Sequence, residues 1–481
     1  MLPDANTGAT PALLASLRAA FTGRLIDDPT EAAPYFRDWR GKWTGAGIGV
    51  AQPDTAEDVA RVVAWCARYG VAVVPQGGNT GLSGGGVPER DGLNLVLSTG
   101  RLNKVRLIDN INNVIVVEAG VTLQQVQEHA EAAGRLFPLS LAAQGTCTIG
   151  GNLATNAGGV QVLRYGNIRD LCLGLEVVTA SGQVWDGLRA LRKDNTGYDL
   201  RDVFIGSEGT LGVITAAVLK LFPMPSVRVV AFAAVPSPAA ATRLLQLAQK
   251  ELGAHLTAFE LLSETCLSLV LRHVPSSRRP LGDASAWYVL LEASAESEAT
   301  PIADVVTSML GTALEQEMVS DAAVSSSLSQ FRDLWALREN ISEAQAAEGR
   351  TIKHDVSLPI TAIAEFIETT AAELVARFPG VRLVVFGHLG DGNLHYNLSP
   401  GPSPDAAQTR EFELLEAPVN RLVHDAVVAR GGSISAEHGL GVLRRDEAAR
   451  YKTPVEIQLM RALKHAFDPM GTMNPAKVLA S

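Results

Sequence analysis

Apolar residues in the first third of the chain recur at two spacings, which predict alternating helices and strands. Residues 55–70, TAEDVARVVAWCARYG, begin with a threonine cap and two acidic residues, carry apolar side chains at helical spacing and stop at Gly70. TLQQVQEHAEAAG predicts another capped helix that stops at Gly134, and MLPDANTGATPALLASLRAAF predicts an amphipathic helix at the N-terminus. The apolar runs VAVVP, NLVLS, VRLI and NVIVVEAG predict buried strands between them.

The pattern changes twice further along the chain. Between residues 145 and 212, Gly, Asn and Thr recur between apolar strands, so the backbone is held close to a ligand or bent sharply in these loops. After Pro223 and Pro225 helices dominate, separated by the strand-like runs VRVVAFAAV, AWYVLLEA and RLVVFGHLGDGNLHYNLS. Pro469 and Pro475 then prevent regular helix after the last one. We therefore place a domain boundary near residue 225.

Length and composition predict a soluble globular protein. A chain of 481 residues suggests two or three domains, and 47% hydrophobic with 19% charged residues describes a well-buried fold. The net charge of -10 and the absence of Lys/Arg runs exclude general nucleic-acid affinity. The four cysteines are far apart, which favours buried reduced thiols: Cys66, Cys147, Cys172 and Cys266. With no basic leader and no long apolar run, we expect a cytoplasmic protein without a transmembrane segment.

Two glycine-rich segments about seventy residues apart predict a site for an extended ligand. QGGNTGLSGGG can bring backbone N–H groups close to phosphate oxygens, because no Cβ blocks the approach. The first half contains neither a G-x-G-x-x-G fingerprint nor the Gly-Lys-Ser/Thr end of a P-loop. GGNLATNAGG repeats the glycine pattern with Thr and Asn as hydrogen-bonding side chains. Together they suit a diphosphate attached to a flat polar ring, as in a flavin nucleotide.

Histidines cluster near the C-terminus and predict a metal site. The chain has nine histidines, and His388 and His395 lie seven apart in the glycine-rich FGHLGDGNLHYN. Three glycines argue against a helix, whereas a strand, a tight turn and a second strand would bring the two imidazoles together. With Glu437 of SAEHGLG they form a divalent-metal set that leaves positions open for substrate. Zinc is our first expectation and manganese our second, although iron or cobalt would accept the same donors. His438 is a candidate general base.

Four motifs carry a resemblance to a known family. VPQGGNTGLSGGGVP, IGGNLATNAGGVQVLRYGN, LRKDNTGYDLRDVFIGSEGTLGVIT and DPMGTMNPAKVL occur in the order seen in vanillyl-alcohol-oxidase, or PCMH-type, flavoproteins. Within that family the chain resembles the FAD-dependent D-2-hydroxyacid dehydrogenases, most of all those that oxidise D-2-hydroxyglutarate. The implied fold class is α+β: a PCMH-type two-subdomain FAD-binding domain over 1–225, an α+β substrate (cap) domain with an antiparallel sheet over 226–425, and a C-terminal helical segment over 426–481 that returns to the flavin.

The resemblance also implies which residues contact FAD. They lie in the two glycine-rich segments, in GSEGTLGVI and in the terminal NPAK: Pro75, Gly77, Gly78, Asn79, Thr80, Gly84, Gly85, Thr146, Thr148, Gly151, Asn152, Thr155, Gly158, Gly159, Glu208, Gly209, Ile214 and Asn474. Some relatives attach the flavin through a His or Cys in these loops. Residues 75–86 contain neither, so we expect non-covalent FAD, with Cys147 as the one thiol nearby.

The same resemblance implies a substrate site. Arg338, Ser342 and Lys353 match residues that hold substrate carboxylate in the similar dehydrogenases, with Ser where Thr is more usual. Asn397 and His438 are expected to contact substrate as well. Because the metal would chelate one carboxylate together with the 2-hydroxyl, two further cations imply a second carboxylate. We therefore expect oxidation of D-2-hydroxyglutarate to 2-oxoglutarate, with the hydroxyl proton passing to His438 and the C2 hydride to flavin N5.

Other readings of the sequence remain open. D-lactate, D-malate or glycolate would keep the chemistry and change the substrate. A metal-dependent hydrolase with a nucleotide-binding domain would be colourless, and a flavin-binding partner subunit of a larger oxidase would not need an activated alcohol site. The resemblance alone suggests an electron-transfer flavoprotein or a quinone as electron acceptor. A homodimer would be an ordinary assembly.

Overall fold

The computed structural model describes residues 9–401 and 405–480, so the start of the predicted N-terminal helix lies outside the described residues. Contacts divide the chain into two compact units. The first unit contains residues 1–158, 167–223 and 437–481, and the second contains 159–166 and 224–436. The sequence-predicted boundaries fall after residues 225 and 425.

The first sheet of the first unit has four strands in the order β1-β2-β4-β3. β2, β4 and β3 are parallel, and β1 is antiparallel to β2. The helix predicted over 55–70 is confirmed: the Thr55 side chain accepts from the Asp58 N–H, and Gly70 ends the helix at a φ of 65°. The elements are α1 (Ala9–Ala20), β1 (Arg24–Ile26), α2 (Pro29–Ala32), η1 (Ala33–Phe36), β2 (Gly49–Gln52), α3 (Ala56–Tyr69), β3 (Ala72–Gln76) and β4 (Asn94–Ser98).

The second sheet of the first unit is antiparallel, with five strands in the order β5-β6-β10-β8-β9. β10 is buried along nearly its whole length, as its apolar sequence VITAAVL requires. β7 and β11 form a separate pair. The elements are β5 (Val105–Asp109), β6 (Val114–Glu118), α4 (Leu123–Ala132), β7 (Arg135–Leu136), α5 (Ile149–Thr155), α7 (Ile168–Leu171), β8 (Cys172–Thr179), β9 (Val184–Gly187), α8 (Leu200–Phe204), β10 (Gly212–Lys220) and β11 (Phe222–Pro223).

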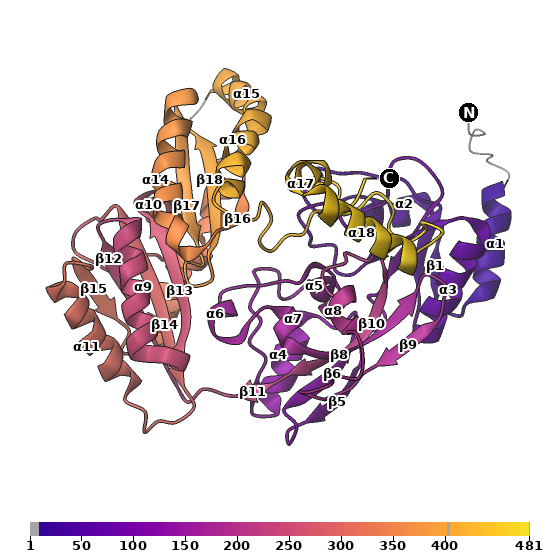
Figure 1. Ribbon diagram of the computed structural model, residues 1–481, viewed down its shortest axis with the longest axis horizontal. Helices are drawn as coiled ribbons and strands as arrows, with labels where there is room; N and C mark the ends of the chain where they lie inside the picture. The colour runs from indigo at the N-terminus through magenta and orange to yellow at the C-terminus, as the bar shows by residue number, and fades with distance from the viewer. Residues whose placement is uncertain (1–8, 402–404, 481) are drawn as a thin grey trace. The chain divides into compact units, whose positions relative to one another are not determined.

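The C-terminal segment, yellow in Figure 1, packs into the first unit. It contains α17 (Arg445–Tyr451) and α18 (Pro454–Phe467). After α18 the chain lies beside β3, because the Val73 N–H donates to the Thr472 carbonyl at 2.8 Å and the Asn474 N–H donates to the Val73 carbonyl at 2.7 Å. Lys464 stabilises this return by donating to the carbonyl groups of Thr210 and Met473. The fold therefore places the predicted NPAK motif beside the strand that precedes QGGNTGLSGGG.

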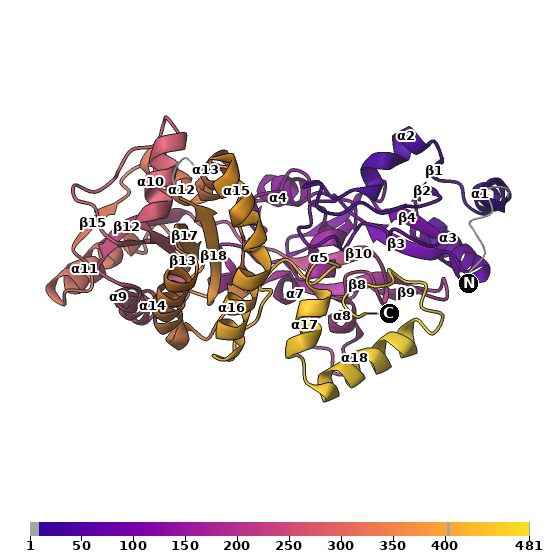
Figure 2. The ribbon, with the colours of Figure 1, turned by 90° about the horizontal axis from the view of Figure 1, so that it is seen from above.

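A seven-stranded sheet forms the centre of the second unit, in the order β15-β12-β14-β13-β17-β18-β16 with antiparallel pairing throughout. Helices cover both faces of this sheet, with α9, α11 and α14 on one of them (Figures 1 and 2). β12 illustrates the reason for helices on both faces. Its residues Val229 and Ala231 belong to one hydrophobic core, whereas Val230 and Phe232 belong to the other. A strand that is apolar on both faces must be covered on both.

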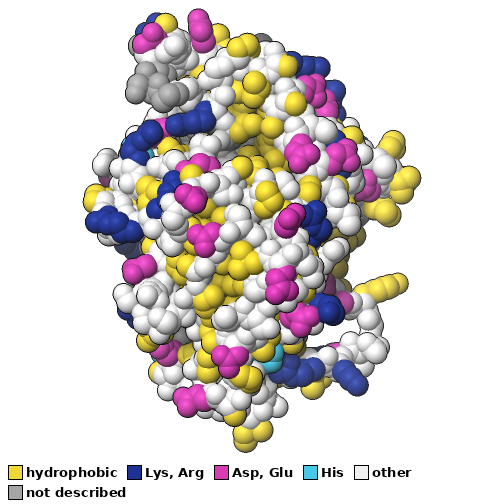
Figure 3. Space-filling view, turned by 90° about the vertical axis from the view of Figure 1, so that its left-hand side faces the viewer, with side chains coloured by type: hydrophobic (Ala, Val, Ile, Leu, Met, Phe, Trp, Pro, Cys, Tyr) yellow, Lys and Arg dark blue, Asp and Glu magenta, His cyan; other side chains and the backbone are white. Residues whose placement is uncertain are grey.

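The strands of this unit are β12 (Val227–Val235), β13 (Leu256–Ser263), β14 (Trp287–Ala295), β15 (Asp321–Val324), β16 (Asp355–Ser357), β17 (Val381–Gly387) and β18 (Asn393–Pro400). The helices are α6 (Val162–Tyr165), α9 (Pro238–Leu252), η2 (Gly253–His255), α10 (Glu264–His273), α11 (Ile302–Glu315), α12 (Leu328–Glu339), α13 (Ile341–Ala347), α14 (Ile360–Arg377), α15 (Ala406–Leu414) and α16 (Glu416–Val428). On the face drawn in Figure 3, hydrophobic side chains form a central strip flanked by charged ones. The edge strand β15 is short and begins with the exposed Asp321, which protects the sheet edge from pairing.

One expectation from the sequence is wrong, and one strand was missed. The segment GGNLAT, predicted as a loop, is the helix α5, because Thr148 caps its start and Asn156 ends it at a φ of 51°. The antiparallel sheet expected after residue 226 is confirmed, but its strand β13 was missed. All four cysteines are free and buried, as predicted. Within the described part of the chain, no helix is long and apolar enough to span a membrane.

Candidate active site

The hairpin of β17 and β18 brings His388 and His395 together, which confirms the predicted strand, turn and strand. Their ring centroids lie 5.7 Å apart. Gly387 makes the tight turn possible: it has a φ of 157°, and a Cβ there would lie 2.4 Å from the carbonyl oxygen of Asn393. Only glycine therefore allows the two strands to close at this point.

The register of the sheet places several polar residues on one face. His395 pairs with Phe386 on one side and with Asp355 on the other, and Phe386 pairs with Leu262 of β13. Cross-strand partners point to the same face, and so do residues two apart along a strand. Glu260, two residues before Leu262, therefore joins His395 and Asp355 on this face.

Glu260 is the centre of a buried polar group. Its Oε1 lies 2.7 Å from Nδ1 of His388, and its Oε2 accepts from Nε of Arg338 at 2.7 Å. Glu260 is fully buried, and Arg338 and His388 are nearly so. Burial raises the pKa of this carboxyl group, but His388 and Arg338 outweigh burial and lower the pKa to about 2. Because a carboxylate can only accept, Nδ1 of His388 carries the hydrogen and Nε2 is left as the possible metal ligand.

The donor set fits a divalent cation. His388, His395 and Glu437 offer ligand atoms that all lie within 4.8 Å of one another, and Asp355, Glu437 and His438 form a second such group. Glu437 follows Ala436, whose N–H donates to the carbonyl of Asp355 at 3.2 Å. Two imidazole nitrogens and one carboxylate oxygen suit zinc, manganese, iron or cobalt.

The predicted substrate residues differ in their surroundings. Arg338 lies at the end of α12 with its guanidinium 4.8 Å from the ring centroid of Phe386. Ser342 is exposed on α13, and Lys353 is half-buried just before β16. Asn397 is buried and bonded within the chain: it donates to Oε1 of Gln345 at 3.0 Å and accepts from the His354 N–H at 3.2 Å.

In the first unit, the two glycine-rich segments pack directly against each other. A Cβ on Gly77 would lie 2.3 Å from Oγ1 of Thr148, and one on Gly78 would lie 1.9 Å from the carbonyl oxygen of Thr146. These two glycines therefore allow the loop after β3 to touch the segment that leads into α5. The structure thus brings together the two segments that the sequence predicted to share one ligand.

Most hydroxyl and amide groups of these segments also hold the loops themselves. Thr148 caps α5, Thr146 donates to the carbonyl of Ala143, and Asn79 donates to the carbonyl of Arg37. Asn152 donates to Sγ of Cys147 at 3.6 Å. Burial raises the pKa of the Cys147 thiol, so it is a poor nucleophile for covalent attachment of a flavin.

The loop that carries His438 is held by two residues of the first unit. Glu208 accepts from the N–H groups of Leu440 at 2.7 Å and Gly441 at 2.8 Å. Ser83 donates to the carbonyl of Gly439 at 3.1 Å. Glu208, predicted to lie along FAD, therefore connects GSEGTLG to the segment after His438, and Ser83 connects that segment to the first glycine-rich loop.

Replacing Glu208 by glutamine should loosen the His438 loop. An amide has one accepting oxygen, so one of the two backbone N–H groups would face an NH₂ group and lose its partner. A hydrogen bond to a charged group contributes about 1.5–3 kcal/mol. We expect faster amide exchange in residues 438–443, measured by hydrogen–deuterium exchange, and a lower melting temperature. Unchanged exchange there would contradict this role, and Glu57→Gln on α3 is the control.

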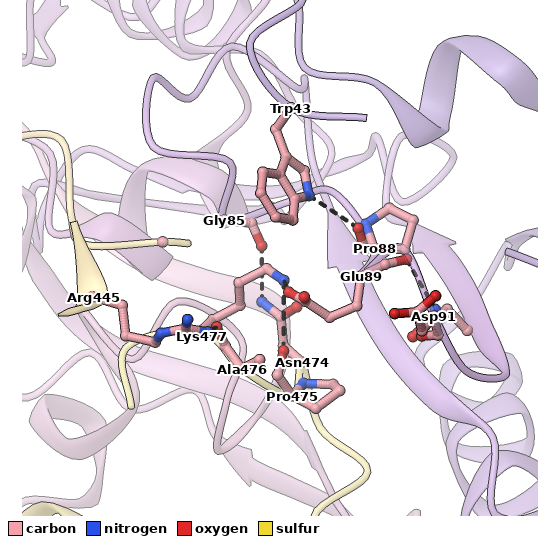
Figure 4. Close-up of polar contacts among 12 residues, drawn as sticks. Trp43, Gly85, Pro88, Glu89, Asp91, Arg445, Asn474, Pro475, Ala476 and Lys477 are labelled. Carbon is pink, nitrogen blue, oxygen red and sulfur yellow. Dashed lines mark hydrogen bonds and ion pairs between the residues drawn. The ribbon is translucent and has the colours of Figure 1, made fainter. Parts of the chain in front are cut away.

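Asn474 joins the same region from the C-terminus (Figure 4). Its Nδ2 donates to the carbonyl groups of Gly85 at 2.9 Å and Glu208 at 2.7 Å. Three residues later Lys477, with a fully buried side chain, pairs with Glu89 at 2.6 Å. Oδ1 of Asn474 is buried without a hydrogen-bond partner in the described part of the chain. A buried acceptor without a hydrogen bond destabilises the fold unless a donor binds it. A flavin ring has N–H groups that could donate to it.

Sequence reasoning missed Glu260 and Ser83. Ser83 had no signal beyond its place in a glycine-rich loop. Glu260 had one: it is a single carboxylate inside the apolar run LTAFELLS, and a charge in a fully buried strand requires a partner. That run was not recognised as a strand.

Comparisons with known proteins agree with this architecture. The FAD binding domain matches residues 48–187, and the C-terminal domain of FAD linked oxidases matches residues 224–478. The mitochondrial D-2-hydroxyglutarate dehydrogenase of Bos taurus is 41% identical over 97% of this chain and 83% of its own length. The D-2-hydroxyglutarate dehydrogenase of Xanthomonas citri pv. viticola is 39% identical over 97% of both chains.

A Schizosaccharomyces pombe relative, named provisionally as a mitochondrial D-lactate dehydrogenase, is 38% identical over 95% of this chain and 87% of its own length. The structure of p-cresol methylhydroxylase has a TM-score of 0.77 at 16% identity, covering 98% of this chain and 97% of that one, and supports the fold alone. Fold and family models together define an FAD-dependent dehydrogenase with a PCMH-type FAD-binding domain. The chain belongs to the family of FAD linked oxidases that includes the D-2-hydroxyglutarate dehydrogenases.

Proposed function

We propose that this enzyme oxidises D-2-hydroxyglutarate to 2-oxoglutarate with non-covalent FAD and a divalent cation, zinc before manganese. His388, His395 and Glu437 hold the cation, and His438 is the general base. The observation that carries this proposal is a pair of 2.7 Å contacts made by Glu260. One is with His388, whose imidazole can ligate a cation, and the other is with Arg338, whose guanidinium can bind a substrate carboxylate. Relatives named for this reaction match nearly the whole chain.

Each residue of the proposed site would have a distinct role in the reaction. Bound FAD would accept the C2 hydrogen as a hydride, and the cation would increase the acidity of the hydroxyl group. Arg338, whose Nε is occupied by Glu260, offers its terminal nitrogens to a substrate carboxylate. Lys353 adds a second cation for the distal carboxylate. His438 takes the hydroxyl proton, and Asn474 offers its buried Oδ1 to a ring N–H of the flavin.

The direct test is anaerobic mixing of purified enzyme with a panel of D- and L-2-hydroxyacids while the flavin absorbance is followed. D-2-hydroxyglutarate should bleach the flavin fastest, its L-enantiomer should not, and a chelator should abolish bleaching. A colourless protein would instead support a hydrolase. Bleaching that a chelator leaves unchanged would refute the metal, and no bleaching by any D-2-hydroxyacid would refute the function.

D-lactate is the second candidate substrate, and D-malate and glycolate follow it. One observation favours a monocarboxylate: Glu260 already neutralises Arg338 through the buried ion pair, which reduces the positive charge available for a second carboxylate. The relative named provisionally for D-lactate points the same way.

Lys353→Ala separates the two substrates. If Lys353 binds the distal carboxylate, KM for D-2-hydroxyglutarate should rise roughly 10- to 100-fold, because a charge-assisted hydrogen bond contributes about 1.5–3 kcal/mol. KM for D-lactate should stay within about twofold. Steady-state kinetics with both substrates measure this, with Lys250→Ala on the exposed face of α9 as the matched control. Equal increases for both substrates would contradict the assignment of Lys353.

We further propose that the reduced enzyme passes its electrons to an electron-transfer flavoprotein or a quinone and that the chain forms a homodimer. Reoxidation rates with each acceptor under anaerobic conditions, and light scattering after gel filtration, test these two points. The proposed compartment remains the cytoplasm.

A further inference from the structure

The second unit contains two Arg–Glu pairs of similar design, with buried glutamates on neighbouring strands. Arg338 is buried as well, whereas Arg228 is exposed. Glu260 of β13 pairs with Arg338 at 2.7 Å, and Glu292 of β14 pairs with Arg228 at 3.0 Å. Each guanidinium lies over an aromatic ring: Arg338 over Phe386 at 4.8 Å, and Arg228 over Phe331 at 4.5 Å. Register places the two glutamates on the same face, because Glu292 pairs with Ala258, two residues before Glu260.

The two pairs differ in their third member. Glu292 accepts from the indole Nε1 of Trp335 at 2.8 Å, whereas Glu260 lies 2.7 Å from Nδ1 of His388. An indole has one ring nitrogen, so the contact with Trp335 ends there and can only support packing. An imidazole has a second nitrogen, and a carboxylate on Nδ1 leaves the lone pair on Nε2. Glu260 can therefore orient His388 as a metal ligand, which Glu292 cannot do for Trp335.

We propose that Glu260 is the positioning residue of the metal site, a role that rests on the proposed function. It fixes His388 in the tautomer and ring orientation that ligate a cation, and it holds Arg338 for the substrate carboxylate. Carboxylate partners of this kind raise the basicity of a ligating histidine, and their removal typically costs about 10- to 100-fold in metal affinity. The matching carboxylate for His395 is weaker, because Oδ1 of Asp355 lies 4.0 Å from Nδ1.

Glu260→Gln is the test, with Glu292→Gln as the matched control. A glutamine at 260 can accept from only one of the two donors, and its NH₂ group repels the other. Titration of the full-length protein with Zn²⁺ against a chromophoric chelator should show a dissociation constant about 10- to 100-fold higher for Glu260→Gln. Glu292→Gln, which alters a glutamate that is also buried and paired with an arginine, should bind Zn²⁺ within about twofold of the unchanged protein. KM for D-2-hydroxyglutarate should rise in Glu260→Gln only.

A second variant protects the test against misfolding, because Glu260→Gln leaves Arg338 buried without a counter-charge. In Glu260→Gln/Arg338→Met that charge is gone, and the loss of Zn²⁺ affinity should remain. If either folded Glu260 variant binds Zn²⁺ within twofold of the unchanged protein, or if Glu292→Gln weakens binding equally, the positioning role is refuted. If the unchanged protein binds no Zn²⁺ that depends on His395, the proposed metal site itself fails, which is a different result.

Discussion

His395→Ala is expected to lower kcat/KM for D-2-hydroxyglutarate by about 1000-fold or more while FAD remains bound. A cation that polarises the hydroxyl oxygen supplies several kcal/mol of transition-state stabilisation, and about 4 kcal/mol corresponds to a factor of about 1000. His395 is the better choice than His388, because His388 is bonded to the buried Glu260 and its loss would disturb that ion pair as well. His395 is half-buried, and its ring centroid lies 4.8 Å from that of Phe386.

Three measurements distinguish metal loss from misfolding. Flavin content and reduction by dithionite should match those of the unchanged enzyme, because the FAD-binding segments belong to the first unit. Bound zinc, measured by plasma mass spectrometry, should fall with the activity. The control is His129→Ala, which removes an exposed histidine on α4. It should leave flavin content, reduction by dithionite and bound zinc unchanged. A His395→Ala enzyme that keeps its metal and its activity would exclude the proposed ligand set.

Local signals account for most of what the sequence predicted about the fold. The cap at Thr55 and the stop at Gly70 lie within one helix length of each other, so short-range chemistry decides where α3 begins and ends. The hairpin that joins His388 to His395 is equally local, since glycines at both of its ends allow the turn. By contrast, α5 contains two glycines in its first turn, which disfavour a helix, and its caps and its contact with Ala119 overcome that preference.

The parts of the site that were missed depend on long-range contacts. Glu260 meets its partners 78 and 128 residues away, and Ser83 meets Gly439 across 356 residues. No periodicity within β13 shows which residue will face its single carboxylate. Likewise, Glu208 looked like a ligand residue because the family motif contains it, whereas its two short contacts are with backbone N–H groups of the His438 loop. Sequence patterns identified the loops, and only the tertiary fold showed which loop supports which.

His438→Ala is expected to slow flavin reduction by about 100- to 10 000-fold, because a positioned general base contributes a factor of that size. The backbone around it should keep its conformation, since Glu208 and Ser83 hold residues 439–441 through main-chain atoms alone. Zinc content and the dissociation constant for substrate should therefore change little. Stopped-flow measurement of flavin absorbance under anaerobic conditions gives the reduction rate constant and the substrate dissociation constant separately.

Chemical rescue shows whether His438 acts as a base or only shapes the loop. Imidazole added to the buffer can enter the space left in His438→Ala and accept the hydroxyl proton, so the reduction rate should increase with imidazole concentration. The same addition should leave His465→Ala, an exposed histidine on α18 in the same C-terminal segment, unchanged. A slow His438→Ala enzyme that imidazole does not accelerate, with faster amide exchange in residues 438–443, would mean that the side chain supports the loop. Full activity without any base at this position would remove His438 from the mechanism and leave proton transfer to another group beside the cation.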